Sequence, residues 1–478
     1  MYRKVSGLLI LTFAATLLNG GSKFTAQHDQ VDDAITLLDL WLNEQMTYRQ
    51  LPSLTIGIVY DQELIWARGY GYADMEQQIP ATPQTLYRIA SITKLFTSTA
   101  IMQLRDAGNL RLDDPVKDYL PWFQLQNPFD EAPAVTIRHL LTHTSGLPRE
   151  AAYPYWTDHN FPTREQIRKA LPDQPMIYPP GSTYKYSNLG MALLGEVVAE
   201  VSGEPYEHYI QAHILEPLSM TSSAVIPTAE HRAISAVGYD RRLPDGSRQE
   251  DYYPVTNGIA PAASIASNIE DMAKYAMLQF RKEDAGGSQI LKGSTLEEMH
   301  RCQFVYNSWS GGRGLGFGVT RRNGKTLVLH GGWVSSYRTH LLFNPAEKIA
   351  IIAMTNAADA KPYRYSYQAY DLVGPAIIDA VTPEPQPSKP EKVWQRYLGR
   401  YADPSGWEYQ VIIHNGRLVL YEHNYPPEDD ALDNLTYLTP VGEHTFRMAD
   451  GENVVFELNK KGNVIRVRRR YDFIYPRK

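Results

Sequence analysis

The chain has 478 residues, of which 43% are hydrophobic and 21% are charged, and its formal net charge is −6 at pH 7. This composition excludes a disordered or fibrous protein, and the acidic balance gives no reason to expect nucleic acid as a partner. The length exceeds the size at which one hydrophobic core usually stops growing, so we expect one large and one small domain.

The N-terminus has the outline of a secretory signal peptide. Arg3 and Lys4 precede an apolar run over residues 8–18, and small polar residues follow it. Residues 1–22 are therefore predicted to be a signal peptide, which would place the protein in the periplasm or outside the cell. The alternative is an uncleaved anchor, although the run is short for a membrane span. An uncleaved segment of this kind is the one route to membrane association that the sequence offers.

Residues 29–381 are predicted to form one domain that mixes helices with antiparallel strands. Apolar residues three and four apart indicate helices, alternation indicates strands, and tight connections favour antiparallel pairing. In chain order we expect a helix at 31–48, strands at 53–60 and 64–72, helices at 91–107, 136–143, 189–201 and 269–281, strands at 317–321, 325–330, 337–344 and 348–355, and a helix at 363–380. The segment 150–185 has no steady period and is expected to be a functional binding loop.

The C-terminal part begins with a proline-rich linker at 382–392, where alternate prolines make the chain stiff and extended. Residues 393–478 then form a succession of short alternating runs separated by turns, such as the one at 461–463. This pattern is typical of a small all-β domain, and we expect a barrel or half-barrel.

Ser91 and Lys94 stand three residues apart at the start of the helix predicted at 91–107. Residues at this spacing share a helix face, so the hydroxyl and the amine can meet. The positive end of the helix dipole would favour a developing oxyanion there. The pair alone is weak evidence, since two ordinary helix residues would often show the same spacing.

Two further motifs make the signature more specific. The segment 186–188 (Tyr-Ser-Asn) lies on an irregular stretch just before a predicted helix, and the segment 330–332 (His-Gly-Gly) ends a predicted strand. Three elements in this order, each in the local structure that its role demands, are typical of one group of serine hydrolases. A Gly-x-Ser-x-Gly elbow, the mark of another hydrolase architecture, does not occur in the sequence.

With these motifs the chain resembles the serine β-lactamase and penicillin-binding protein superfamily, in the branch that includes class C β-lactamases, DD-carboxypeptidases, D-aminopeptidases and related esterases. The segments 112–116, 136–147 and 178–182 are also similar to that branch. The resemblance runs from about residue 33 to 380 and implies an α+β, β-lactamase-like fold, with an antiparallel sheet flanked by helices and a helical region beside it. The C-terminal part resembles the lipocalin-like domain of some of these hydrolases, and we expect it to cap or border the cleft.

The catalytic residues that this reading implies are Ser91, Lys94 and Tyr186. Ser91 would attack a carbonyl group and become acylated, and Lys94 is a usable base only if burial or nearby positive charge lowers its pKa. Tyr186 can relay a proton to the leaving group and then activate water. Whether Lys94 or Tyr186 is the primary base stays open, and neither a cofactor nor a metal ion is expected.

The substrate-binding residues that the resemblance implies are Asn188, His330, Gly331, Gly332 and Trp333. Asn188 is expected to hold the acyl chain of the substrate and to orient Lys94, and the backbone N–H groups of Ser91 and Trp333 are expected to form the oxyanion hole. Many β-lactamases have lysine in place of His330. Because a histidine is mostly neutral at pH 7, we expect weaker binding of penicillin-type carboxylates. A purely structural histidine is the alternative at this position.

His139 and His143 lie four residues apart on a predicted helix and could bind a metal ion. No glutamate that could serve as a general base lies between them, and no third ligand is apparent. Packing or helix capping is therefore the favoured interpretation.

These observations predict an exported serine hydrolase that forms an acyl-enzyme on Ser91. We expect a small-molecule or peptide substrate, either an ester or a peptide or amide with D-residues. A β-lactamase is the alternative within the class. A non-catalytic peptidoglycan-binding or sensor module is the alternative from another class, and the intact catalytic positions disfavour it. The oligomeric state stays open.

Overall fold

The computed structural model describes residues 28–129, 131–151, 155–281, 289–382, 392–414, 416–423, 434–470 and 472–477. The chain divides into two compact units, one ending at Val381 and the other beginning at Thr382. The predicted signal peptide and all but the ends of the predicted linker lie outside the described residues.

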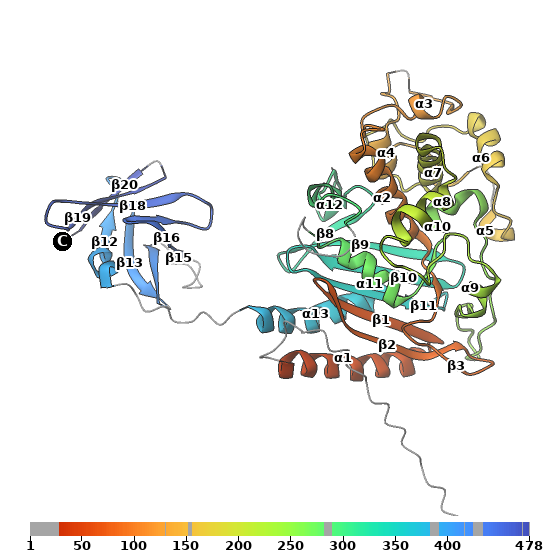
Figure 1. Ribbon diagram of the computed structural model, residues 1–478, viewed down its shortest axis with the longest axis horizontal. Coiled ribbons are helices and arrows are strands. Elements are labelled where there is room, and N and C mark those ends of the chain that lie inside the picture. Colours follow the sequence, from red (N-terminus) through yellow and green to blue (C-terminus); the bar gives the residue numbers. More distant parts are fainter. Residues whose placement is uncertain are drawn as a thin grey trace, which may run out of the picture. The chain divides into compact units, whose positions relative to one another are not determined.

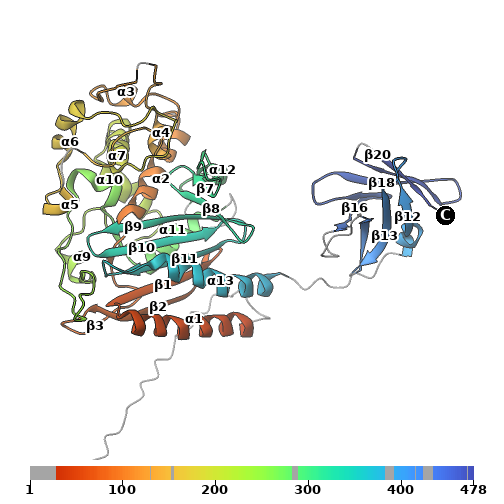
Figure 2. The same cartoon turned by 180° about the vertical axis from the view of Figure 1, so that it is seen from behind.

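The first unit is built on a nine-stranded antiparallel sheet with helices on both faces (Figures 1 and 2). In spatial order its strands are β3 (Ile79–Pro80), β2 (Glu63–Asp74), β1 (Ser53–Tyr60), β11 (Ile349–Thr355), β10 (Tyr337–Asn344), β9 (Lys325–Val334), β8 (Gly318–Arg322), β7 (Gly311–Arg313) and β6 (Phe304–Val305). The predicted hairpin at 53–72 is confirmed as β1 and β2, and β1 pairs on its other side with β11.

Helices α1 (His28–Arg49) and α13 (Pro362–Val381) pack together against one face of this sheet, and α11 (Ile269–Leu278) covers the other. On the α11 side Gly57 is required, because a Cβ atom there would lie 2.5 Å from a side-chain carbon of Ile269. Two separate apolar clusters fill the two faces of the sheet. This arrangement agrees with the predicted α+β architecture.

A mainly helical region lies beside the sheet (Figure 1). Its helices are α2 (Thr93–Asp106), α3 (Val116–Tyr119), α4 (Ile137–Leu141), α5 (Tyr155–Asp158), α6 (Arg164–Ala170), α7 (Asn188–Ser202), α8 (Tyr206–Ile210), α9 (Ala229–Ala233), α10 (Ala260–Ala263) and α12 (Gly293–His300). Helix α7 begins where Ser187 caps it by accepting a hydrogen bond from the N–H of Gly190, and it ends at the left-handed Gly203. None of the helices in the described part of the chain is both long and apolar enough to cross a membrane.

The second unit is a nine-stranded antiparallel sheet. Its strands, in spatial order, are β15 (Leu435–Tyr437), β14 (Arg417–His423), β13 (Glu408–His414), β12 (Gly399–Ala402), β20 (Asp472–Pro476), β19 (Val464–Arg469), β18 (Asn453–Leu458), β17 (Thr445–Arg447) and β16 (Thr439–Gly442). Only Leu438 separates the two edge strands along the chain, so the sheet curls back on itself and is nearly a barrel. The predicted single run at 464–474 is wrong, because a turn at Arg470 divides it into β19 and β20.

Two buried histidines of the first unit make its stability depend on pH. Burial lowers the pKa of His300 to about 3 and that of His340 to about 4. Unfolding returns each to its ordinary value near about 6.5, so the unfolded chain binds more protons in acid and the free energy of unfolding falls as the pH falls below that value. Each histidine is expected to lose about 2 kcal/mol of stabilisation by pH 5.

Urea unfolding at pH 7.5 and pH 5 checks this expectation. Glutamine at position 300 cannot titrate, and its amide nitrogen can replace the imidazole Nε2 that contacts Gln279 at 3.0 Å. In His300→Gln the loss of stability between the two pH values should therefore be smaller by about 2 kcal/mol than in the wild type. An equal loss in the two proteins would contradict the assignment of the neutral form to His300.

Candidate active site

Ser91 lies in a 3-10 turn, η1 (Ala90–Ile92), immediately before α2. The predicted helix therefore begins two residues later than expected. Ala90 has a φ of +51°, a conformation that residues other than glycine rarely adopt, so the surrounding structure must hold the turn. The carbonyl group of Ile89 accepts a hydrogen bond from the Thr339 hydroxyl on β10 at 3.0 Å, and this bond ties the turn to the sheet.

Lys94 is fully buried on the first turn of α2. Its Nζ lies 3.0 Å from the Oγ of Ser91 and donates a hydrogen bond of 2.8 Å to the carbonyl oxygen of Ala262 on α10. The serine and lysine thus meet as their spacing predicts. The Ala262 bond fixes the direction of the amine, because it occupies one of the N–H donors.

The surroundings favour the neutral form of the Lys94 amine. Burial lowers its pKa well below the ordinary value of 10.5; the Glu150 carboxylate opposes this effect, and the guanidinium groups of Arg149 and Arg313 add to it. The condition under which Lys94 can act as a base is therefore met.

Tyr186 lies beside the same amine, with its ring centre 4.9 Å from the Lys94 Nζ. The Arg149 guanidinium lies 5.1 Å from the ring centre. Burial raises the pKa of the Tyr186 phenol, and the hydroxyl of Ser91 and the nearby arginines act against the rise. The phenol is consequently protonated in the resting site and can donate a proton.

Asn188 is the first residue of α7 and is buried. Its Nδ2 donates a hydrogen bond of 2.6 Å to Glu150, while its Oδ1 has no partner among the described residues. The predicted contact that would orient Lys94 is absent between these two described residues, because Glu150 takes the amide and Ala262 takes the amine. The Oδ1 is therefore a buried acceptor without a described partner beside the site.

His330 lies near the end of β9 and is 4% exposed. Its Nδ1–H donates a hydrogen bond of 2.8 Å to the carbonyl oxygen of Gly331, so its Nε2 is an acceptor, and that atom has no partner among the described residues. Burial lowers its pKa well below 6.5, and the nearby Arg313 charge adds to this effect. The ring is therefore neutral, as the sequence suggests.

Gly332 allows β9 to approach the nucleophile closely. A Cβ atom at this position would lie 2.2 Å from the Thr339 hydroxyl and 2.3 Å from the carbonyl oxygen of Ile89. The next residue, Trp333, is 65% exposed, and the Arg338 guanidinium lies 4.5 Å from its ring centre. The strand end therefore lies beside the Ser91 turn, which the predicted oxyanion hole requires.

A cavity of about 510 Å³ opens over Ser91 and Tyr186. Of the other predicted site residues, His330, Gly331, Gly332 and Trp333 line it, whereas Lys94 and Asn188 do not. The lining also includes residues that the sequence reasoning missed: Arg149, Tyr184, Arg313, Arg338, Thr339, His340, Lys361 and Tyr363. Among the described residues of this lining there are four arginine or lysine side chains and no aspartate or glutamate. The cavity is consequently cationic.

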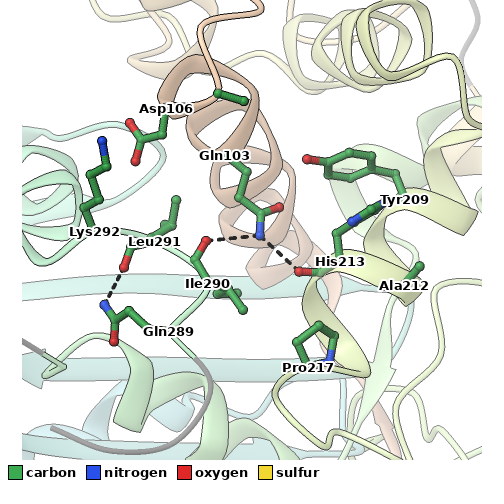
Figure 3. A pocket seen from close by; sticks show the side chains of 11 residues that line it. Gln103, Asp106, Tyr209, Ala212, His213, Pro217, Gln289, Ile290, Leu291 and Lys292 are labelled. Atoms are coloured by element: carbon green, nitrogen blue, oxygen red, sulfur yellow. Dashed lines mark hydrogen bonds between the residues drawn. The ribbon is translucent and has the colours of Figure 1, made fainter. Parts of the chain in front are cut away.

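A second cavity, of about 560 Å³, lies around the C-terminal end of α2 (Figure 3). There Gln103 donates hydrogen bonds to the carbonyl oxygens of His213 and Ile290, at 3.0 and 3.3 Å. None of the predicted site residues lines this cavity, and no serine is among the described residues that line it. The chemistry of the protein is therefore assigned to the cavity over Ser91.

The two histidines that could have bound a metal ion have other roles. His139 forms a capping box at the start of α4, because its Nδ1 accepts from the N–H of Thr136 and its own N–H donates to the Thr136 hydroxyl. The Nδ1 of His143 accepts a hydrogen bond from the N–H of Ser187. The capping interpretation is therefore confirmed for His139.

The fold is that of the serine hydrolase superfamily that contains β-lactamases and penicillin-binding proteins. The family model described as beta-lactamase matches residues 38–374, and the chain belongs to this family. The predicted β-lactamase-like fold with a C-terminal all-β domain is thereby confirmed.

Comparison with individual proteins gives distant similarities. "Protein flp" of Staphylococcus aureus (strain MW2) is 27% identical over 331 residues, which cover 68% of this chain and 64% of that protein. The chain thus matches less than two thirds of the length of this relative. The octameric penicillin-binding protein homologue from Pyrococcus abyssi is 26% identical with a TM-score of 0.62, covering 92% of this chain and 99% of that one. A β-lactamase/D-alanine carboxypeptidase from Yersinia pestis is 25% identical with a TM-score of 0.61, covering 72% and 98%.

Proposed function

We propose that the protein is an exported serine hydrolase that forms an acyl-enzyme on Ser91 and cleaves an ester, or a peptide or amide with D-residues. One observation carries this proposal. The fully buried amine of Lys94 lies 3.0 Å from the Ser91 hydroxyl in surroundings that keep it neutral. A neutral amine at this distance can accept the hydroxyl proton, which a serine needs in order to act as a nucleophile.

The geometry supports Lys94 as the first base. As the Oγ of Ser91 attacks the carbonyl carbon, its proton passes to the Lys94 amine, and the backbone N–H groups of Ser91 and Trp333 would bind the oxyanion. The Tyr186 phenol, which is already protonated, gives its proton to the leaving group as the carbon–heteroatom bond breaks, and the Lys94 ammonium can return a proton to the phenolate. Water then attacks the acyl-enzyme by the reverse proton route and releases the acid.

The cationic cavity favours a substrate with an anionic group. Arg313 is 6% exposed, no described carboxylate forms an ion pair with it, and its Nε has no hydrogen-bond partner among the described residues. A buried guanidinium without a counter-ion is costly, so a carboxylate of the substrate would be bound strongly there. This charge offsets the loss of the lysine that many β-lactamases carry in place of His330.

Replacing Arg313 with glutamine is expected to raise the KM for a carboxylate-bearing ester, such as a p-nitrophenyl hemisuccinate, by roughly tenfold or more. The KM for uncharged p-nitrophenyl acetate should change little. Steady-state kinetics on both esters measure the difference. Arg321→Gln, on the exposed end of β8, is the matched control. Equal changes for the two esters would exclude a charge-selective role for Arg313.

A substrate panel tests the proposal against its alternatives. Purified protein is assayed with short esters, D-amino-acid amides, muropeptides and nitrocefin, and labelling by a fluorophosphonate is followed in parallel. Turnover of an ester or a D-residue amide supports the proposal, whereas rapid hydrolysis of nitrocefin alone would favour a β-lactamase. Binding of a muropeptide without turnover or labelling would favour a non-catalytic module. The lack of an acidic residue in the described cavity lining disfavours a substrate held by a free ammonium group.

The C-terminal unit is proposed to narrow the choice of substrate, because such domains accompany some hydrolases of this kind. Deletion of residues 391–478 should then broaden the range of esters and amides that the enzyme accepts. A stable truncated enzyme with the substrate range of the full chain would refute this role.

Export is proposed from Arg3, Lys4 and the apolar run at 8–18, and N-terminal sequencing of the mature protein tests it.

A further inference from the structure

His143 lies just beyond α4 and is not used by the chemistry described above. It is 1% exposed, and its φ of +57° lies in the left-handed region. It does not line the cavity over Ser91. A buried polar residue in a rarely adopted backbone conformation must be held there by its contacts, and such strain is often found at functional sites.

The contacts of His143 enclose Tyr186. The carbonyl oxygen of His143 accepts a hydrogen bond of 2.8 Å from the N–H of Lys185, and its Nδ1 accepts one of 3.2 Å from the N–H of Ser187. These two N–H groups stand on either side of Tyr186 in the chain. In addition, the imidazole ring centre lies 4.4 Å from the centre of the Tyr186 ring, with the planes tilted by 37°. One residue therefore restrains both the backbone and the ring of Tyr186.

We propose that His143 is a positioning residue that holds the Tyr186 phenol in place for proton transfer to the leaving group. The proposal rests on the proposed function, because it assumes that Tyr186 is the proton donor. A shift of the phenol by a fraction of an ångström would lengthen the proton transfer, and misplacement on this scale lowers rates substantially.

The alternatives for His143 fit less well. Because Nδ1 accepts a hydrogen bond from a backbone N–H, the ring proton is on Nε2. Burial lowers the pKa of His143 well below 6.5, and the nearby Arg313 charge adds to this effect, so the neutral ring is favoured in the resting site. Among the described residues no group of three or more histidine, cysteine, aspartate or glutamate side chains could hold a metal ion. The contacts of His143 therefore favour a role in restraining Tyr186.

The dependence on the leaving group tests this role, since a good leaving group needs no proton. The test compares the ethyl ester and the p-nitrophenyl ester of the acyl group that the wild type hydrolyses best. In His143→Ala, kcat/KM for the ethyl ester is expected to fall by roughly 10²-fold, and for the p-nitrophenyl ester by less than roughly fivefold. His143→Asn should retain most of the activity toward both esters, because the asparagine Oδ1 can accept from the Ser187 N–H and asparagine tolerates positive φ.

Equal losses for the two esters in His143→Ala, or an unchanged rate for both, would overturn the proposal, and so would an asparagine variant as slow as the alanine variant. If His143→Ala does not fold, His143→Gln takes its place in the test. The glutamine amide lies one bond farther from the backbone than the histidine Nδ1, so it does not reproduce the contact with the Ser187 N–H. Ser91→Ala is assayed alongside. If it is inactive while His143→Ala resembles the wild type, the inference about His143 fails and the proposed function stands. If Ser91→Ala is active, both fail.

Discussion

Ser91→Ala is expected to abolish hydrolysis of every substrate that the wild type cleaves, with kcat lowered by roughly 10⁵-fold or more. The reason is chemical: without the Oγ no covalent bond to the acyl group can form, and neither Lys94 nor Tyr186 can replace it. The fold should be retained, because the described contacts of the Ser91 hydroxyl are with Lys94 and Tyr186, which other contacts hold in place. Initial rates measure the loss of hydrolysis, and labelling by a fluorophosphonate measures the loss of the nucleophile.

An exposed serine provides the control for Ser91→Ala. Ser308→Ala should be labelled and should turn over substrate like the wild type, because its hydroxyl contacts only the Ser310 hydroxyl. Retained labelling of Ser91→Ala at another residue would show that the nucleophile is misassigned.

Lys94→Met is expected to lower kcat/KM by roughly 10³-fold. Methionine keeps the unbranched, buried shape of the side chain but removes the amine that lies 3.0 Å from the Ser91 hydroxyl. The apparent thermal stability should fall only by the loss of the hydrogen bond to the Ala262 carbonyl oxygen, because methionine still fills the buried space. Steady-state kinetics and a thermal denaturation curve measure the two quantities, with Lys169→Met, at an exposed position on α6, as the control.

The dependence of kcat/KM on pH tests whether Lys94 acts in its neutral form. Only the neutral amine can accept the proton of Ser91, so wild-type kcat/KM should fall as the pH falls through the lowered pKa of Lys94 and should reach a plateau above it. The phenol of Tyr186 has a raised pKa, so no loss of activity from its ionisation is expected until strongly alkaline pH. In Lys94→Met the acid limb should disappear from the residual activity. A residual activity within tenfold of the wild type would contradict the role of Lys94 as base.

The sequence predicts the parts of the site that depend on local spacing. Ser91 and Lys94 meet because residues three apart in a helical turn share a face. The strands at 53–60 and 337–355 are clear from their alternating or continuous apolar residues, and they form the centre of the sheet. The resemblance supplied Tyr186 and the segment 330–332, which the fold then brings into one cavity with Ser91.

The remaining features depend on packing that no local pattern encodes. The left-handed turn at Ala90 carries no glycine to mark it, so the helix was predicted to begin at Ser91. Arg313 lies in a glycine-rich run for which no strand was predicted, yet it forms the end of β7 and lines the cavity with Arg149. The expectation that His330 weakens carboxylate binding was based on one position and did not include these arginines, which the fold brings to the same cavity.

The central claim is a covalent acyl-enzyme on Ser91, and mass spectrometry of an acid-quenched reaction tests it most directly. The wild type is mixed with an ester substrate, quenched within the first turnover and digested with trypsin. Cleavage after Arg88 and Lys94 gives the peptide Ile89–Lys94, which contains Ser91. This peptide is expected to gain the mass of the acyl group, and fragmentation should place that group on Ser91. An acyl group on another residue, or turnover without any adduct while product is released in a burst, would contradict it.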